Sequence, residues 1–151
     1  MALIGKLVSE LEIHSNANKF YNFFKHQIFH IPSLSPKLIQ KVKVHEEDWN
    51  THAHVSTKIW IYTIDGKAEV FKERVEFDDK KLVMTLVGLE GGVFKHYKTF
   101  KLTYQIVPKE PERSLVILIL EYEKLDDGST YPYKYTDLLS NIIKDIESHL
   151  K

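Results

Sequence analysis

Residues 132–151, PYKYTDLLSNIIKDIESHLK, carry the clearest helical pattern in the chain. Their apolar side chains recur at the spacing of an α-helix and form one stripe, made of Tyr135, Leu138, Leu139, Ile142, Ile143, Ile146 and Leu150. A stripe of this length has to be covered by a large apolar surface. The rest of the chain indicates what that surface is.

Residues 42–124 read as a series of about six short antiparallel strands. Turn signals interrupt the series at Asp65-Gly66, Asp78-Asp79 and Gly91-Gly92. Residues 3–13 alternate between apolar and charged side chains and predict one more half-buried strand. Residues 114–122, SLVILILEY, are apolar on both parities, which predicts a strand covered on both faces.

Two short helices are predicted after the first strand. Ser15 and Asn16 offer capping oxygens for a helix whose apolar residues follow i, i+3, i+4, i+7 spacing from Ala17 to Phe24. Residues 31–40 contain two prolines, so they predict a turn with at most a short second helix. The fold class is therefore α+β, and the absence of repeats, linkers and low-complexity segments predicts one domain over residues 1–151.

Composition excludes several classes of function. Twenty-one basic and 21 acidic residues give a formal net charge of zero, which argues against nucleic acid or an anionic membrane as partner. The chain has no cysteine, hence no disulfide and no thiolate metal site. Lys6, Glu10 and Glu12 interrupt the N-terminal apolar positions, so neither a secretory signal nor a membrane span is predicted and the expected location is cytoplasmic.

Seven segments resemble plant major latex proteins, which are related to the birch-pollen allergen and the class-ten pathogenesis-related proteins. They are GKLVSELEI, SNANKFYNFFK, WIYTIDGKAEVFKERVE, LEGG, YKTFKLT, LEYEKL and DIESHLK, spread in order over the whole chain. The resemblance implies a helix-grip (START-like) fold, in which a curved seven-stranded antiparallel sheet surrounds the C-terminal helix. It also implies a hollow interior that takes apolar or amphipathic plant metabolites, and an association with defence or stress.

The stretch VHEEDWNTHAHV, residues 44–55, departs from the glycine-rich loop of that family. Without glycines a nest of backbone N–H groups is hard to form, and three acidic residues would repel an anion, so a phosphate cradle is rejected. His52 and His54 share one face if they lie in a strand, but H-x-H alone is a weak zinc signal. We predict no metal and no cofactor, and interpret the stretch as a lengthened solvated loop at the pocket mouth.

The resemblance favours Trp60 and Tyr62 inside the pocket, and alternation would then turn Lys58 inward as well. The interpretation favoured here for Lys58 is that it lies near a loop end and reaches solvent. The remaining expected ligand-binding residues are Phe20, Phe24, Val70, Glu73, Met84, Leu86, Tyr97, Leu118, Leu138, Leu139 and Ile142. Leucine at 118, where some members of the family it resembles have tryptophan, would enlarge the pocket or change its stacking chemistry.

Glu73 and His96 are candidate acid/base groups. Glu73 lies on an apolar parity between Phe71 and Val75, where burial would raise its pKa. The alternative is that Glu73 is a structural carboxylate, which would pair with Lys58 if both side chains face inward. A strand bulge would turn His96 outward and place Tyr97 inside.

These residues predict a non-enzymatic binding protein for a small apolar or amphipathic metabolite, as a monomer or weak dimer. The alternative is a cofactor-independent enzyme that catalyses a condensation or isomerisation with Glu73, His96, Lys58 or Tyr62. A third hypothesis is an interaction module that works through exposed loops.

Overall fold

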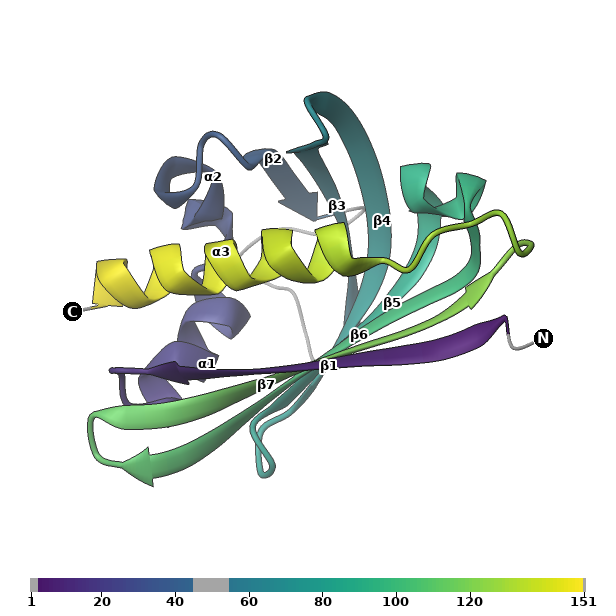
Figure 1. Cartoon of the computed structure of the whole chain (residues 1–151). Coiled ribbons are helices and arrows are strands. Elements are labelled where there is room, and N and C mark those ends of the chain that lie inside the picture. The colour runs from purple at the N-terminus through teal and green to yellow at the C-terminus, as the bar shows by residue number, and fades with distance from the viewer. Residues whose placement is uncertain (1–2, 45–54, 151) are drawn as a thin grey trace.

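The computed structural model describes residues 3–44 and 55–150, which form one sheet and a set of helices against its inner face (Figure 1). The strands are β1 Ile4–Ile13, β2 Ile39–Val44, β3 Val55–Ile64, β4 Lys67–Asp78, β5 Val83–Gly91, β6 Tyr97–Glu110 and β7 Arg113–Lys124. The α-helices are α1 Ala17–His26, α2 Ile31–Leu34 and α3 Tyr133–Leu150, and two 3₁₀ turns are η1 Ile28–His30 and η2 Gly92–Lys95.

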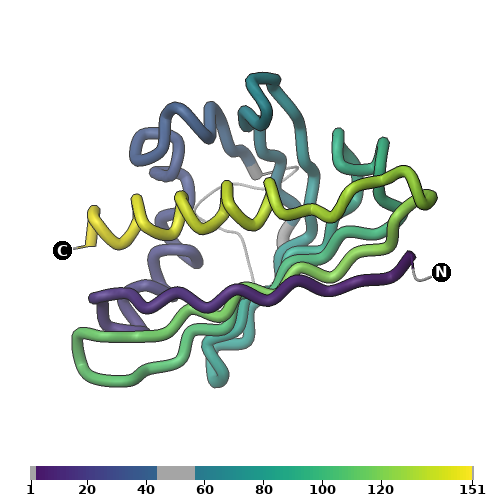
Figure 2. The backbone as a smooth tube through the Cα atoms, viewed as in Figure 1, coloured from purple at the N-terminus to yellow at the C-terminus, as the bar shows by residue number. Residues whose placement is uncertain are grey.

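All seven strands pair antiparallel in the order β1-β7-β6-β5-β4-β3-β2. The sheet curves, and α3 runs across its concave face (Figures 1 and 2). Helices α1 and α2 connect the two edge strands, β1 and β2, and both contact α3. This is the predicted helix-grip arrangement, with short helices after the first strand.

Local chemistry fixes the start of α1. Asn16 is the N-cap, since its side-chain oxygen accepts a hydrogen bond from the backbone N–H of Lys19 at 3.1 Å. Its side-chain amide donates to the carbonyl of Pro111 at 2.9 Å, which joins the helix start to the β6–β7 connection. The predicted cap is therefore confirmed.

The β3–β4 hairpin turns at the predicted Asp65-Gly66 pair. Both residues have positive φ, 53° at Asp65 and 74° at Gly66. A two-residue turn with both φ values positive matches the twist of the flanking strands, and glycine adopts this conformation without strain. The hairpin fixes the register that places Tyr62 opposite Glu69 and Lys58 opposite Glu73.

Strand β7 is buried on one face only, which corrects the prediction of cover on both faces. Val116, Leu118 and Leu120 are 0% exposed on the inner face. The alternate residues Leu115, Ile117 and Ile119 are half-buried on the outer face. The prediction from the uniformly apolar sequence was therefore wrong, because the outer face of this strand is only half-buried.

The helical stripe of residues 132–151 faces the sheet as predicted. Ile143 and Ile146 are 0% exposed, and Ile142 lies beside them at 6%. Leu139 and Leu150 pack against the core while partly buried. Burial of the stripe anchors α3 on the concave face.

Replacing Ile143 by alanine should lower the free energy of unfolding by about 2–5 kcal/mol, because it removes packed atoms and leaves a cavity. The neighbouring Lys144 is exposed, so Lys144→Ala is the matched control and should change stability by less than about 0.5 kcal/mol. Urea unfolding followed by tryptophan fluorescence measures both. Equal effects of the two substitutions would show that α3 is not anchored as described.

Candidate ligand-binding pocket

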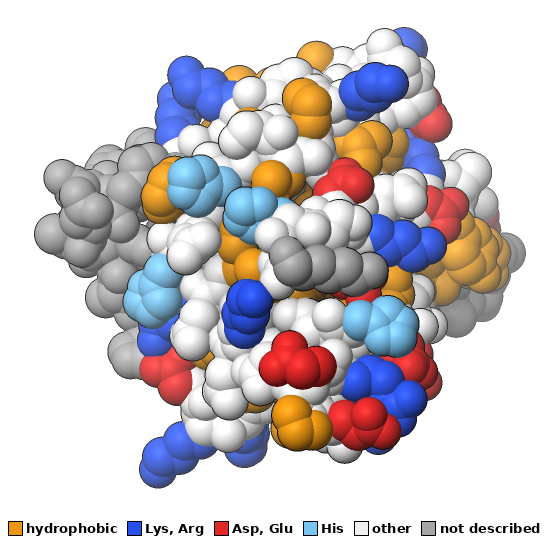
Figure 3. All heavy atoms as spheres, turned by 90° about the vertical axis from the view of Figure 1, so that its left-hand side faces the viewer, with side chains coloured by type: hydrophobic (Ala, Val, Ile, Leu, Met, Phe, Trp, Pro, Cys, Tyr) orange, Lys and Arg blue, Asp and Glu red, His pale blue; other side chains and the backbone are white. Residues whose placement is uncertain are grey.

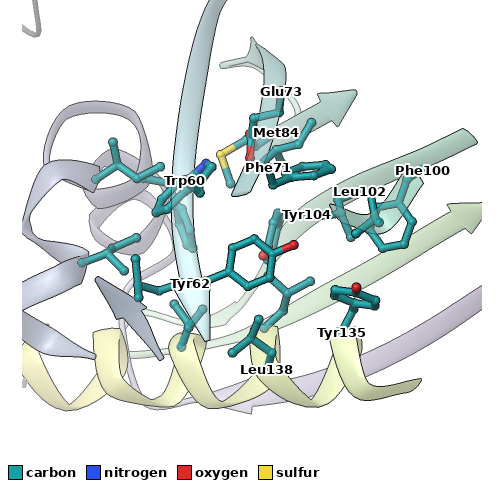
Figure 4. Close-up of a pocket in the computed structure, with 18 residues that line it drawn as sticks. Trp60, Tyr62, Phe71, Glu73, Met84, Phe100, Leu102, Tyr104, Tyr135 and Leu138 are labelled. Carbon is teal, nitrogen blue, oxygen red and sulfur yellow. The ribbon is translucent and has the colours of Figure 1, made fainter. Parts of the chain in front are cut away.

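A pocket of about 80 Å³ lies between the concave face of the sheet and the helices (Figure 4). Its wall is almost entirely aliphatic and aromatic, and among the residues that the structure describes Glu73 is the one carboxylic acid in it. Nine of the residues expected at the pocket are in the wall: Phe24, Trp60, Tyr62, Glu73, Met84, Leu86, Leu138, Leu139 and Ile142. Their position is as expected, and their contact with a ligand stays a prediction.

Nine further wall residues were not singled out as ligand-binding from the sequence: Ile28, Ile31, Ile39, Phe71, Val93, Phe100, Leu102, Tyr104 and Tyr135. The sequence pattern could have identified some of them as facing the pocket. Phe71 shares the parity of Glu73, and Tyr135 belongs to the helical stripe. Ile28 and Ile31 lie in η1 and α2, whose irregular spacing hides which side faces inward.

Five expected pocket residues lie outside the wall: Phe20, Lys58, Val70, Tyr97 and Leu118. Val70 is 47% exposed, because alternation along β4 turns it away from the face that carries Phe71 and Glu73. Phe20 and Leu118 are both 0% exposed but belong to the packed core outside the pocket wall. Tyr97 is also buried outside the wall, where its hydroxyl donates to the carbonyl of Thr130 at 2.6 Å.

Lys58 is buried, contrary to the favoured interpretation that it reaches solvent. Its side chain is 0% exposed, on the same strand face as Trp60 and Tyr62, but outside the pocket wall. The ammonium nitrogen lies 5.8 Å from the ring centroid of Phe77. Alternation along β3 forces this orientation, because the two aromatic residues face inward.

Glu73 is 2% exposed, on the same face of β4 as Phe71. Within the described residues its Oε2 atom has no hydrogen-bond partner. Burial raises the pKa of Glu73 to about 8, while the positive charge of Lys58 and a hydrogen bond with Trp60 pull the pKa down. At neutral pH the carboxyl is therefore mostly protonated, so it can donate as well as accept a hydrogen bond.

His96 does not reach the pocket, which corrects its candidacy as an acid/base group. It follows η2, where the β6–β7 register shifts between Tyr97 and Thr99, and its side chain is exposed. The backbone irregularity turns His96 outward and Tyr97 inward, as the bulge hypothesis expected.

A second polar cluster, not found from the sequence, joins Tyr62, Glu69 and Tyr135. The hydroxyl of Tyr62 donates to Oε1 of Glu69 at 2.7 Å, and the hydroxyl of Tyr135 donates to the same oxygen at 3.0 Å. Burial, together with the adjacent Glu69, raises the pKa of both tyrosines, which keeps them protonated and able to donate. Tyr62 and Tyr135 line the pocket, and Glu69 lies behind them, outside the wall.

The metal hypothesis gains no support from the described residues, which contain no group of three histidine or acidic side chains able to hold a metal ion. His52, His54 and most of the 44–55 stretch lie outside the described residues.

Charges of both signs are interspersed on the face where α3 ends (Figure 3). Neither sign dominates that face, in keeping with the balanced composition. In the part of the chain that the structure describes, no helix is long and apolar enough to cross a membrane.

A curved antiparallel sheet that grips one long helix above an apolar pocket defines a helix-grip, START-like protein, a fold that often binds ligands. The chain belongs to the pathogenesis-related protein Bet v 1 family, whose sequence pattern matches residues 2–151. Within that family it is similar to the major latex-like proteins.

MLP-like protein 329 from Arabidopsis thaliana is 37% identical over 150 residues, covering 99% of this chain and 98% of that protein. The crystal structure of ginseng major latex-like protein 151 from Panax ginseng superposes with a TM-score of 0.90 at 31% identity, covering 99% of both chains. A START superfamily protein from Mycobacterium smegmatis shares the fold, with a TM-score of 0.75 at 16% identity and 96% of each chain covered.

Glu73 should make stability depend on pH between its unfolded and folded pKa values, about 4.5 and 8. In this window the unfolded chain has lost a proton that the folded chain retains, so stability falls as pH rises, by at most about 1.4 kcal/mol per pH unit. Glu73→Gln removes this dependence. Its stability relative to the parent protein should therefore rise by roughly 2 kcal/mol from pH 5.5 to 7.5.

Urea unfolding at several pH values measures this difference. Glu76→Gln is the matched control, since Glu76 lies on the same strand with its side chain 46% exposed, and this variant should keep the pH dependence that Glu73 produces. A Glu73→Gln effect that is constant over this window would contradict the raised pKa.

Proposed function

We propose that the protein binds one small apolar or amphipathic plant metabolite in the pocket under α3. The observation that carries the proposal is the wall itself, which is apolar and aromatic apart from a few polar groups. Such a wall gives affinity through burial of apolar surface, and its isolated polar groups give orientation. Membership of a family whose fold often binds ligands supports the same conclusion.

The size of the pocket limits how binding occurs. Its 80 Å³ is far below the roughly 300–1,000 Å³ typical of drug-sized ligand sites, so a larger ligand has to displace wall side chains. Met84 is suited to this because its unbranched side chain changes rotamer easily. Leu139 on α3 is only partly buried and gives the wall a second adaptable position.

The free carboxyl oxygen of Glu73 favours ligands with at least one hydrogen-bonding group. A buried polar atom without a partner costs free energy, and a ligand hydroxyl or amine at Oε2 would recover it. An amphipathic molecule therefore fits this wall better than a pure hydrocarbon.

Titration with the neutral fluorescent probe N-phenyl-1-naphthylamine tests the proposal. The protein should bind it with one site per chain, and Leu138→Trp, which fills the pocket from α3, should weaken binding at least tenfold. Val70→Trp is the matched control, because Val70 is 47% exposed and outside the wall, and it should bind the probe like the parent protein. Equal binding by Leu138→Trp would place the probe elsewhere.

One observation favours a second function, a cofactor-independent enzyme acting in the same pocket. A carboxyl with a pKa near 8 is poised to exchange a proton at neutral pH. His96 is exposed and Lys58 lies outside the wall, so this hypothesis now depends on Glu73, with Tyr62 or Tyr104, which both interact electrostatically with Glu73, as phenol candidates in the wall.

Incubation with a plant metabolite extract distinguishes the two functions. If the protein is an enzyme, new compounds accumulate at many equivalents per chain, and Glu73→Gln abolishes their formation while still binding N-phenyl-1-naphthylamine. Retained turnover in Glu73→Gln would remove Glu73 from the account. Cytoplasmic location, a role in defence or stress, and a monomer or weak dimer remain predictions alongside the proposed function.

A further inference from the structure

We propose that Glu69 fixes the hydrogen-bonding polarity of one end of the pocket, so that this end takes ligand hydroxyl or ammonium groups and rejects carboxylates. The inference rests on the proposed binding function and specifies the class of ligand. Glu69 acts through Tyr62 and Tyr135 and is a positioning residue.

Three elements bring the cluster together. Tyr62 on β3 is paired directly with Glu69 on β4 in the hairpin register, and Tyr135 comes from the first turn of α3. Oε1 of Glu69 accepts from Tyr62 at 2.7 Å and from Tyr135 at 3.0 Å, and Oε2 lies 3.2 Å from the Tyr135 hydroxyl. Figure 4 shows both tyrosine side chains in the wall, Tyr62 coming from the sheet and Tyr135 from α3.

The donors and acceptors of the two tyrosine hydroxyls determine the hydrogen-bonding polarity of this end of the pocket. A phenol has one O–H donor and two acceptor lone pairs. Both tyrosines give their single donor to a carboxylate, an acceptor stronger than a neutral one. What remains for a ligand is the lone pairs of two hydroxyl oxygens, so this end of the pocket accepts hydrogen bonds and does not donate them.

Charge acts in the same direction. The ammonium of Lys134 lies 5.4 Å from the ring centroid of Tyr135, but it is bonded to Asp65 at 2.8 Å and is half-exposed to solvent. It therefore compensates Glu69 only weakly. A ligand ammonium would be attracted by the Glu69 carboxylate behind the tyrosines, and a ligand carboxylate would be repelled.

The backbone of η2 lies close against Glu69. A Cβ atom at Gly92 would lie 2.8 Å from Cδ of Glu69, closer than real contacts permit. Glycine at this position therefore lets the turn approach the carboxylate directly.

The test is displacement of N-phenyl-1-naphthylamine at pH 7 by three molecules with one framework: 3-phenylpropan-1-ol, 3-phenylpropylamine and 3-phenylpropionate. The parent protein should bind the alcohol and the amine at least tenfold more tightly than the carboxylate. Glu69→Gln should reduce that ratio at least fivefold, because a neutral amide removes the negative charge that repels a ligand carboxylate and accepts the tyrosine hydrogen bonds less strongly.

Glu76→Gln is the control for charge, since it removes a carboxylate from the same strand without touching the tyrosines, and its ratio should equal that of the parent protein. A purely structural role for Glu69 would weaken all three ligands equally and leave the ratio unchanged. That result would overturn the inference, as would equal binding of carboxylate and alcohol by the parent protein.

Tyr135→Phe keeps Glu69 and provides an independent variant should Glu69→Gln not fold. It should weaken the alcohol and the amine several-fold more than it weakens N-phenyl-1-naphthylamine; equal changes for all three molecules would contradict the proposal. If the parent protein does not bind the naphthylamine, the proposed function fails and the inference falls with it. Binding of the naphthylamine without discrimination among the three phenylpropyl compounds defeats the inference alone.

Discussion

One long helix has to cover the concave face of a seven-stranded sheet, and the rest of the structure depends on this constraint. Along its C-terminal half α3 packs tightly, with Ile143 and Ile146 fully buried. Along its first half, Tyr135, Leu138 and Leu139 instead line the pocket. One apolar stripe therefore makes both the core that anchors the helix and the wall that leaves space for a ligand. A flatter sheet would pack against the helix along its whole length and leave no pocket.

The polar groups in and directly behind the pocket wall lower the stability of the fold, so their presence is informative about function. Glu73 is almost fully buried, and one of its oxygens has no partner among the described residues, while Glu69 draws two phenol donors away from the pocket. A core under selection for stability alone would favour apolar side chains at such positions. The two carboxyl groups differ in role, because Glu73 lies in the wall and Glu69 lies behind it. Together they give an apolar pocket two fixed points for the polar groups of a ligand.

Sequence patterns predicted the features that local physics determines. Helical periodicity identified α3, Asn16 capped α1 as expected, and the Asp65-Gly66 turn formed the hairpin. Alternation alone left the inward face of β3 undecided, and the family resemblance placed Trp60 and Tyr62 correctly. Lys58 was misjudged because the preference of an ammonium for water was given more weight than the alternation that turns it inward with its neighbours. Glu69 was missed because Tyr135, one of its two partners, is 66 positions away in sequence, and no periodicity relates a strand of the sheet to the start of a helix.

The central claim is that the pocket holds one small metabolite, and native mass spectrometry after incubation with a plant metabolite extract tests it most directly. The account predicts one bound molecule per chain, released unchanged and carrying an apolar framework with hydroxyl or amine groups. Detection of the bare chain alone, or of adducts whose number keeps rising with extract concentration, would contradict it.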